Sequence, residues 1–366
     1  MTRRVYLHVG APKTGTTYLQ DRLAANRTEL AQHGVHYPLG LHASHFRAAL
    51  DLIDVSWGGQ REGARGEWDK LTDRVRRLDG TVIISHEILA GARPKRIRKA
   101  MQALEGSGDG EVHLVYSARD IARQIPAEWQ EGIKHRRRRS FAKFLTQVQA
   151  ANRKKPGMWF WKAQGLPDVL TRWGSGLPPE RIHVVTVPQP GAPRDELWQR
   201  YCAAFGIDPG WAPVESAREN VSIGTAETAL IRKLNRRLRK GLVSGPDYRR
   251  LVRQLVVHET LAHRAKMRKA VLPPFAYDWA DEIAEEWIEW VEGAGVHIVG
   301  DVEDLRPVRP EPDISWRNPD KPRRRKMVDA ALDALVAMTV EAASRPDPQA
   351  QMSAKIGRAA RRLRGQ

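Results

Sequence analysis

The chain has 366 residues, enough for one large α/β domain with insertions or for two ordinary domains. Hydrophobic residues make up 41% of it, which excludes wholesale disorder, and its single cysteine, Cys202, excludes both an intrachain disulfide and a cysteine-cluster metal site. The net charge of +18 arises from 61 Lys and Arg against 43 Asp and Glu. This balance favours anionic ligands: nucleotides, sulfated or phosphorylated substrates, nucleic acid or acidic lipid surfaces.

Membrane and export signals are not expected from the pattern. No apolar run approaches the roughly 18 residues that a membrane-spanning helix needs. The first four residues, Met-Thr-Arg-Arg, pass directly into a strand-like segment without the apolar core of a signal peptide. We therefore expect a cytoplasmic protein without a membrane span.

Short β-branched runs alternate with longer segments of helical periodicity along most of the chain. The strand-like runs are 5–9, 81–85, 112–116, 182–187 and 296–300. Such alternation is typical of a mostly parallel sheet covered by helices, so the predicted fold class is α/β.

The later part of the chain is predicted to be mainly helical. Segments 222–269 and 278–291 have helical patterns, and the second places most of its tryptophans on one side. In the same region Cys202 lies among helical, apolar neighbours and is expected to be a core residue.

A proline-rich run at 306–312 is expected to end the main domain, because closely spaced prolines continue neither a helix nor an interior strand. We predict an α/β domain over 1–305, with its helical portion at about 220–293, and a Pro/Arg-rich extension over 306–366. In this extension 326–343 has a helical repeat, and 355–364 is short and basic; either could dock on the body or stay mobile.

The most specific pattern follows the first strand and reads Gly10-Ala-Pro-Lys-Thr-Gly-Thr-Thr17. A glycine-containing loop between a strand and a helix directs backbone N–H groups and the positive helix end towards one point, which suits a phosphate or a sulfate. Gly10 and Gly15 have the spacing of a Walker A loop. However, the lysine is Lys13 inside the loop, and Thr16 stands where a nucleoside triphosphatase carries lysine.

The order Pro-Lys-Thr-Gly-Thr-Thr after an N-terminal strand resembles the 5′-phosphosulfate loop of sulfotransferases that use 3′-phosphoadenosine 5′-phosphosulfate (PAPS). The resemblance implies a P-loop-type, three-layer α/β/α fold with a helical C-terminal region. It also implies that Lys13 supports the bridging oxygen of the leaving phosphate, where a fixed ammonium stabilises developing charge. The residues implied to bind the cofactor here are Pro12, Lys13, Thr14, Gly15, Thr16 and Thr17.

A second element of the resemblance follows the strand at 112–116. In the family, an arginine after this strand and a serine eight residues later grip the 3′-phosphate. Arg119 matches the arginine, whereas Ala127 stands at the serine position. Gln124 or Ser117 could supply a replacement hydrogen bond, and the loss of one such bond costs about 1 kcal/mol. The alternative for Arg119 is a surface salt bridge with a neighbouring acidic residue, Asp120 or Glu128.

The strand at 81–85 ends in two proton-transfer residues, His86 and Glu87. A general base must lie near the acceptor hydroxyl, and the carboxyl ends of central strands are where such groups converge. Bacterial and Golgi-type sulfotransferases often place Glu near here, and the cytosolic animal enzymes place His. We favour Glu87 as the base, with His86 as the alternative or as a substrate contact. In the structural alternative Glu87 is a capping residue and His86 is packed.

The basic run Lys134-His-Arg-Arg-Arg-Arg139 either attracts an anionic acceptor or forms a solvated surface. We do not expect a nucleic-acid partner, because a recognised motif or interleaved aromatic residues would be needed. No metal-ligand set is evident, so no metal cofactor is expected.

The resemblance is to a soluble bacterial member of the PAPS-dependent sulfotransferase family and rests on about residues 5–37, 81–90 and 112–130. It implies a transferase that moves a sulfuryl group from PAPS to a hydroxyl, or less favourably an amine, of a carbohydrate, lipid or small metabolite. Two alternatives stay open: a P-loop nucleotide kinase or triphosphatase, and a catalytically inactive basic binding protein on the same fold. Ala127 is the residue that favours the inactive alternative.

Overall fold

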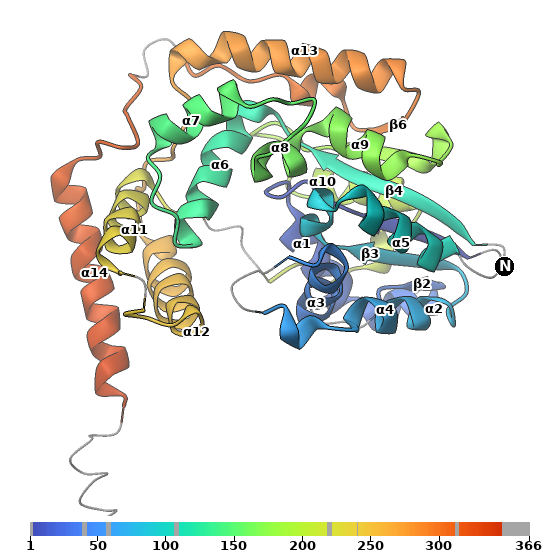
Figure 1. The fold of residues 1–366 in the computed structure, drawn as a ribbon, viewed down its shortest axis with the longest axis horizontal. Helices are drawn as coiled ribbons and strands as arrows, with labels where there is room; N and C mark the ends of the chain where they lie inside the picture. The colour runs from blue at the N-terminus through green and yellow to red at the C-terminus, as the bar shows by residue number, and fades with distance from the viewer. Residues whose placement is uncertain are drawn as a thin grey trace, which may run out of the picture. The chain divides into compact units, whose positions relative to one another are not determined.

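The chain forms two compact units (Figure 1). The computed structural model describes residues 3–38, 42–55, 60–105, 110–217, 222–239, 241–311 and 315–345. The first unit is built from Met1–Gly132, Arg139–Asn220 and Ala270–Asp320, and the second from Ile133–Arg138, Val221–Lys269 and Lys321–Gln366. Among the described helices, none is both long and apolar enough to cross a membrane.

Six parallel strands form the sheet of the first unit, in the order β2-β3-β1-β4-β5-β6. They are β1 (Arg4–His8), β2 (Val35–His36), β3 (Thr81–Ser85), β4 (Glu111–Ala118), β5 (Ile182–Thr186) and β6 (His297–Val299). The predicted α/β class is confirmed, and so are the five strand-like runs. The pattern misses β2 because its two residues are too few to show a period.

The order of the strands reverses at β1. In register, Leu7 of β1 lies between Ile84 of β3 and Leu114 of β4. The chain leaves β1 for the edge strand β2, returns through β3 and then crosses to β4 on the other side of β1. In open parallel sheets, ligands bind outside the carboxyl ends of the strands at such a reversal. The loops after β1, β3 and β4 therefore converge at the edge where the sequence places its site.

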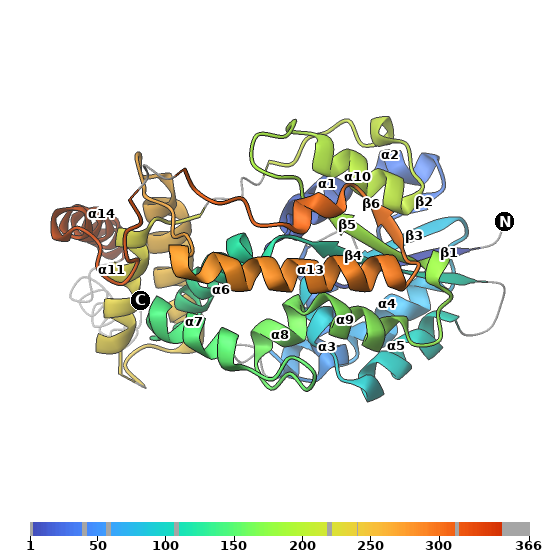
Figure 2. The same cartoon turned by 90° about the horizontal axis from the view of Figure 1, so that it is seen from above.

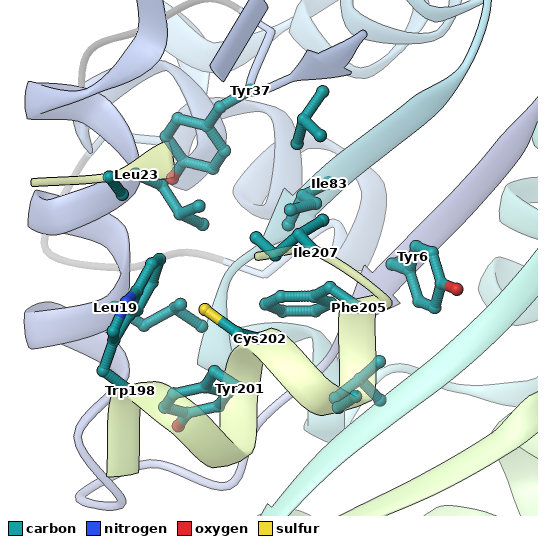
Figure 3. Close-up of a cluster of buried hydrophobic side chains, with 14 of the residues drawn as sticks. Tyr6, Leu19, Leu23, Tyr37, Ile83, Trp198, Tyr201, Cys202, Phe205 and Ile207 are labelled. Carbon is teal, nitrogen blue, oxygen red and sulfur yellow. The ribbon is translucent and has the colours of Figure 1, made fainter. Parts of the chain in front are cut away.

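Helices cover both faces of the sheet. On one face α1 (Thr16–Ala25), α2 (Arg27–Gln32) and α10 (Glu196–Phe205) contribute to an apolar cluster (Figure 3). The cluster includes Tyr6, Leu19, Leu23, Tyr37, Ile83, Val115, Trp198, Cys202, Phe205 and Ile207. Cys202 is buried there, as its helical neighbours predict, and burial raises the pKa of its thiol.

Residues that alternate with Val115 along β4 face the opposite side of the sheet. The Tyr116 hydroxyl donates to the Ala163 carbonyl of α8 (Trp159–Gln164) at 3.0 Å, and Leu114 lies beside α9 (Leu166–Gly174). In Figure 2, α13 (Tyr277–Gly293) runs alongside α8 and α9. Its buried side includes Ile283, Trp287 and Ile288, so the predicted apolar side of this helix is the one that packs.

The remaining helices of the first unit flank this core. They are α3 (His42–Ile53), α4 (Glu67–Val75), α5 (Pro94–Glu105), α6 (Ile121–Lys134) and α7 (Phe141–Ala150), with 3-10 turns at Glu62–Ala64, Glu87–Gly91 (η2), Pro179–Arg181, Pro209–Trp211, Pro274–Ala276 and Val302–Leu305. The last two residues of α6 fall in the second unit.

The second unit is helical. It contains α11 (Thr225–Arg237), α12 (Gly245–Asp247), the helical segment Tyr248–Thr260, a turn at Leu261–His263 and α14 (Arg324–Ala343). The helical repeat predicted at 326–343 is thus present as α14, which packs along α11. The boundary between the units does not fall at the proline-rich run. Residues 270–320, which include this run, belong to the first unit with the sheet, whereas α14 belongs to the second unit with α11. The basic segment 355–364 lies outside the described residues.

Candidate functional site

The loop between β1 and α1 is fastened to β4 and η2. The Val9 and Ala11 N–H groups donate to carbonyl oxygens of β4, Val115 at 3.0 Å and Ser117 at 2.9 Å. Gly10 has a φ of 139°, and a Cβ there would lie 3.3 Å from the Glu87 carbonyl oxygen. Only glycine accepts this backbone conformation without strain, so the loop approaches η2 because position 10 has no side chain.

Buried side chains hold the loop from behind. The Pro12 carbonyl accepts hydrogen bonds from the side-chain amides of Gln124 and Gln164, both at 2.9 Å. The Thr14 hydroxyl donates to the Ala11 carbonyl at 2.6 Å, and the Thr14 carbonyl accepts from the Tyr201 hydroxyl at 3.2 Å. The Thr14 hydroxyl therefore stabilises the loop by a hydrogen bond inside it, and hydrogen bonds within the protein fix the loop conformation without a ligand.

The amino end of α1 is open to an anion. Gly15 precedes the helix with a φ of 88°, and among the described residues no side chain caps the first-turn N–H groups. Thr16 is buried, whereas Thr17 is partly exposed, so the Thr17 hydroxyl is the more accessible of the two. Uncapped N–H groups and the positive helix end together favour a negatively charged group at this point.

Lys13 extends from the loop to α6. Its Nζ lies 3.1 Å from Oε2 of Glu131, and the two side chains are 34% and 21% exposed. Lys13 itself has a φ of 66°, a left-handed conformation that is uncommon for a residue with a side chain. Strained backbone that is held by its surroundings is found preferentially at functional sites.

Glu128 lies one helical turn before Glu131 on α6. Burial raises the pKa of Glu128 to about 7; the charges of Lys13 and Arg119 lower it, and those of Glu131 and Glu87 raise it further. Glu128 therefore lies close enough to Lys13, Arg119 and Glu87 for their charges to change its pKa. A carboxyl that titrates near neutral pH is suited to proton transfer.

Arg119 directly follows β4. Its Nη2 donates to the Arg123 carbonyl at 2.9 Å, while its Nε is buried and has no hydrogen-bond partner among the described residues. Burial lowers the pKa of Arg119 to about 10, which leaves the guanidinium charged at neutral pH. The side chain and the backbone N–H of Arg123 both donate to the Asp120 carboxylate, so the cationic partner of Asp120 is Arg123 and not Arg119. Arg119 is thus a charged side chain with an unused, buried donor.

The two proposed substitutes for a serine at position 127 are already engaged. The Gln124 amide donates to the Pro12 carbonyl and, at 2.7 Å, to Oε1 of Gln164, which uses both of its hydrogens. The Ser117 hydroxyl shares hydrogen bonds with His8 and Tyr201, both at 2.7 Å. In this geometry Gln124 and Ser117 hold the loop and its surroundings, and neither has a donor to spare for a phosphate.

The strand-end residues His86 and Glu87 have different surroundings. His86 precedes η2, its Nδ1 accepts from the Ile88 N–H at 3.3 Å, and its side chain is 10% exposed. The Glu87 side chain is 26% exposed, and its Oε2 accepts from the Gln20 amide at 3.2 Å. Burial alone would raise the pKa of Glu87, but His86, Gln20 and its own N–H together hold it below the usual range. The lowered pKa keeps Glu87 ionised at neutral pH, and its side chain is more accessible than that of His86.

A buried polar network joins these strand ends. His8, the last residue of β1, shares hydrogen bonds with Ser85 of β3 at 2.8 Å and with Ser117 of β4 at 2.7 Å. The Gln20 amide donates to the Ser85 carbonyl at 3.3 Å. Burial lowers the pKa of His8 to about 4, so the ring is neutral and offers one donor and one acceptor to its two neighbours.

Lys13, Arg119 and Glu87, the residues on which the sequence interpretation rests, all act electrostatically on Glu128. Sequence reasoning missed the role of Glu131 and considered Glu128 only as a salt-bridge partner. The available signal was their spacing of three on the helix after Arg119, which places both on one face. No signal indicates the buried amides of Gln20 and Gln164, because isolated glutamines in helices are usually on the surface.

Comparison with known proteins adds no relative to this picture. No protein-family model matches the chain, and neither the curated proteins nor the solved structures yielded a match. The chemistry of the site residues is therefore the basis on which a function can be assigned.

Proposed function

We propose that the protein is a PAPS-dependent sulfotransferase with a P-loop-type phosphosulfate site, acting on a hydroxyl of a carbohydrate, lipid or small metabolite. One observation carries the proposal. The loop presents a lysine and an uncapped helix end, and the neighbouring strand of the sheet ends in a charged arginine with an unused donor. The loop follows β1 and Arg119 follows β4, which are hydrogen-bonded neighbours. This arrangement suits a ligand with two anionic groups.

The residues present fit such a ligand. The first-turn N–H groups of α1 and the Thr17 hydroxyl are suited to the 5′-phosphate, and Lys13 to the oxygen that bridges phosphorus and sulfur. Arg119 Nε is suited to the 3′-phosphate, and a planar guanidinium can bind phosphate through two parallel hydrogen bonds. Because the donors of Gln124 and Ser117 are already engaged in hydrogen bonds within the protein, Arg119 would be the main residue that recognises the 3′-phosphate.

The proposed transfer uses the Lys13 ammonium and a carboxylate at this edge of the sheet. The acceptor oxygen attacks sulfur, its O–H proton passes to a carboxylate, and the bond from sulfur to the bridging oxygen breaks. That electron pair stays on the phosphate, where the Lys13 ammonium stabilises it. The products are the sulfated acceptor and 3′,5′-adenosine bisphosphate.

Glu87 is our choice for the proton acceptor, because it is ionised and partly exposed whereas the Nδ1 of His86 is engaged in capping η2. Glu128 is a second carboxyl near Lys13 and is the stronger base of the two. The roles differ in their pH dependence: a base with the lowered pKa of Glu87 is active across neutral pH, whereas Glu128 loses its proton only near pH 7.

Calorimetric titration with 3′,5′-adenosine bisphosphate tests the nucleotide site. We expect binding to the wild type, a loss of about tenfold or more in Lys13→Ala and Arg119→Ala, and no change in Arg74→Ala. Arg74 is a matched control because it is exposed on α4, which leads into the opposite end of β3. 5′-AMP, which lacks the 3′-phosphate, should bind the wild type and Arg119→Ala equally weakly.

The same titrations separate the alternatives. A preference for ATP with Mg²⁺ would replace this proposal with a nucleotide kinase or triphosphatase. Tight bisphosphate binding without release of bisphosphate from PAPS, over a panel of sugar, lipid and small-molecule hydroxyl acceptors, would favour an inactive binding protein. Binding that ignores the 3′-phosphate would remove the role given to Arg119.

A further inference from the structure

The two units differ in charge. The sequence of the second unit has 28 Lys and Arg against 7 Asp and Glu, a net charge of +21, whereas that of the first has 33 against 36, a net charge of −3. A bias of the whole chain towards arginine would raise the positive charge of both units. The excess therefore belongs to the second unit, and it is of the kind that attracts a polyanion.

Two stretches of the second unit carry much of this charge and contain no acidic residue. Four of the residues at 133–138 are Lys or Arg, and so are six of those at 228–246. The Asn235 side-chain amide, which belongs to the second stretch, donates to the carbonyls of Ile133 at 2.8 Å and Arg137 at 2.9 Å. The two stretches therefore lie against each other in the folded unit.

The exposed residues of α11 are all cationic. They are Lys233, Arg236 and Arg237, whose spacing of three and four places them on one side of the helix. Arg137 and Arg239, from the same two stretches, are exposed as well, and we call these five residues the basic patch. Within the described part of the chain, no acidic side chain forms an ion pair with any of them. Like charges at such spacings destabilise a helix unless an anion neutralises them.

We propose that the basic patch binds the phosphate backbone of double-stranded DNA without reading its bases. The inference concerns the second unit and is independent of the proposed sulfotransferase activity. Lys233 and Arg237 are about 6 Å apart along the helix axis. Three cations in this length match a duplex, which carries one negative charge per about 1.7 Å of its axis. The sequence expectation against a nucleic-acid partner relied on the lack of a base-reading motif, and backbone binding needs none.

Two features of the second unit favour a duplex over other polyanions. A single strand carries one charge per about 3.4 Å and is held largely by stacking on aromatic rings. Tyr248 is the only Phe, Tyr or Trp in the sequence of the unit, and it is buried. A helix that lies on a bilayer carries apolar residues beside its cations. No residue of α11, which is described from Thr225 to Arg237, is both apolar and exposed.

Fluorescence anisotropy of a labelled DNA duplex, titrated with the full chain, tests the proposal. If all five residues of the basic patch contact phosphates, the affinity should fall about 500-fold between 50 and 200 mM salt. The triple variant Lys233→Gln/Arg236→Gln/Arg237→Gln should bind more weakly at 50 mM salt, and its affinity should then fall only about 10-fold. Arg236→Gln alone should reduce the slope of log Kd against log salt by about one. Duplexes of unrelated sequence should bind equally.

The matched control is Arg74→Gln/Arg77→Gln/Lys95→Gln, which makes the same change in net charge at exposed positions of the first unit. This variant should keep the salt dependence of the wild type. Circular dichroism checks that all the variants are folded. An excess of 3′,5′-adenosine bisphosphate should not displace the duplex, and displacement would assign the binding to the loop after β1 instead.

Other results would also overturn the proposal. These are a wild type that does not bind the duplex at 50 mM salt, and an equal salt dependence in the two triple variants. Tighter binding of a single strand of the same length would exclude the duplex as the preferred ligand. Tighter binding of hyaluronan or of phosphatidylglycerol vesicles, lost in the patch variant, would assign the basic patch to an acidic polysaccharide or to a membrane surface.

Discussion

The ion pair between Lys13 and Glu131 provides the sharpest prediction for the site. An anion that binds at the amino end of α1 must compete with Glu131 for the Lys13 ammonium, because Nζ and Oε2 are 3.1 Å apart. Glu131→Gln removes that competition and the repulsion between Glu131 and the anion. Both partners are partly exposed, so the pair is worth no more than about 1 kcal/mol. The variant should therefore bind 3′,5′-adenosine bisphosphate roughly fivefold more tightly than the wild type.

Titration calorimetry at low and high salt measures this effect. Glu180→Gln is the matched control, because it makes the same change in net charge at an exposed position before β5, at the opposite edge of the sheet. The gain in Glu131→Gln should shrink as salt rises, since screening weakens the pair and the repulsion alike. Equal tightening in both variants would mean that only net charge matters. Weaker binding in Glu131→Gln would refute the reasoning, because Glu131 would then help to position Lys13.

Three further predictions concern the loop and the buried groups near it. Gly15→Ala should lower the free energy of unfolding by about 1 kcal/mol more than Gly34→Ala in urea titrations. Both glycines have a positive φ, but of the two only Gly15 would place a Cβ against another residue, 2.6 Å from Cδ2 of Leu197, whose partly exposed side chain must shift. Equal losses would contradict the clash. Sulfate binding should strengthen as pH falls through about 7, where Glu128 takes up its proton and stops repelling the anion, and calorimetry of Glu128→Gln should show this dependence removed. Burial lowers the pKa of His8 to about 4 from 6.5, so the stability that its neutral form contributes is complete above pH 6.5 and is lost as pH falls towards 4. At pH 5 the loss should be about 2 kcal/mol. In urea titrations the free energy of unfolding of His8→Gln should depend less on pH than that of the wild type, and an equal dependence would argue against burial as the cause.

The sheet and the convergence of the site could be predicted because both depend on rules that act along the sequence. β-branched runs identify strands, and the carboxyl ends of parallel strands meet at one edge. Arg119 directly follows β4, Glu87 is the second residue after β3, and Lys13 lies in the loop after β1. Their placement at that edge therefore required no knowledge of side-chain packing. The position of Cys202 in the core followed equally from its apolar helical neighbours.

The partners of these residues could not be predicted, because they depend on how helices are rotated and packed. Whether Glu131 reaches Lys13 depends on which side of α6 faces the loop. The raised pKa of Glu128 depends on burial that only the folded chain creates. Gln124 has a sequence position compatible with a phosphate contact, yet the approach of Pro12 and Gln164 engages its donors. The assignment of α14 to the helical unit likewise depends on long-range packing against α11.

The hydrogen bonds of His8 explain how the carboxyl ends of β1, β3 and β4 are held in fixed positions relative to one another. A single neutral imidazole bridges Ser85 and Ser117, and these residues immediately precede the segments that carry Glu87 and Arg119. The loop with Lys13 follows His8 itself, so three site-bearing segments diverge from one buried, hydrogen-bonded point. Catalytic groups are most effective when their positions are set before the ligand arrives, since reorganisation then adds little to the barrier. A histidine at the end of β1 is thus best understood as the group that holds these three strand ends in register, with its titration suppressed by burial.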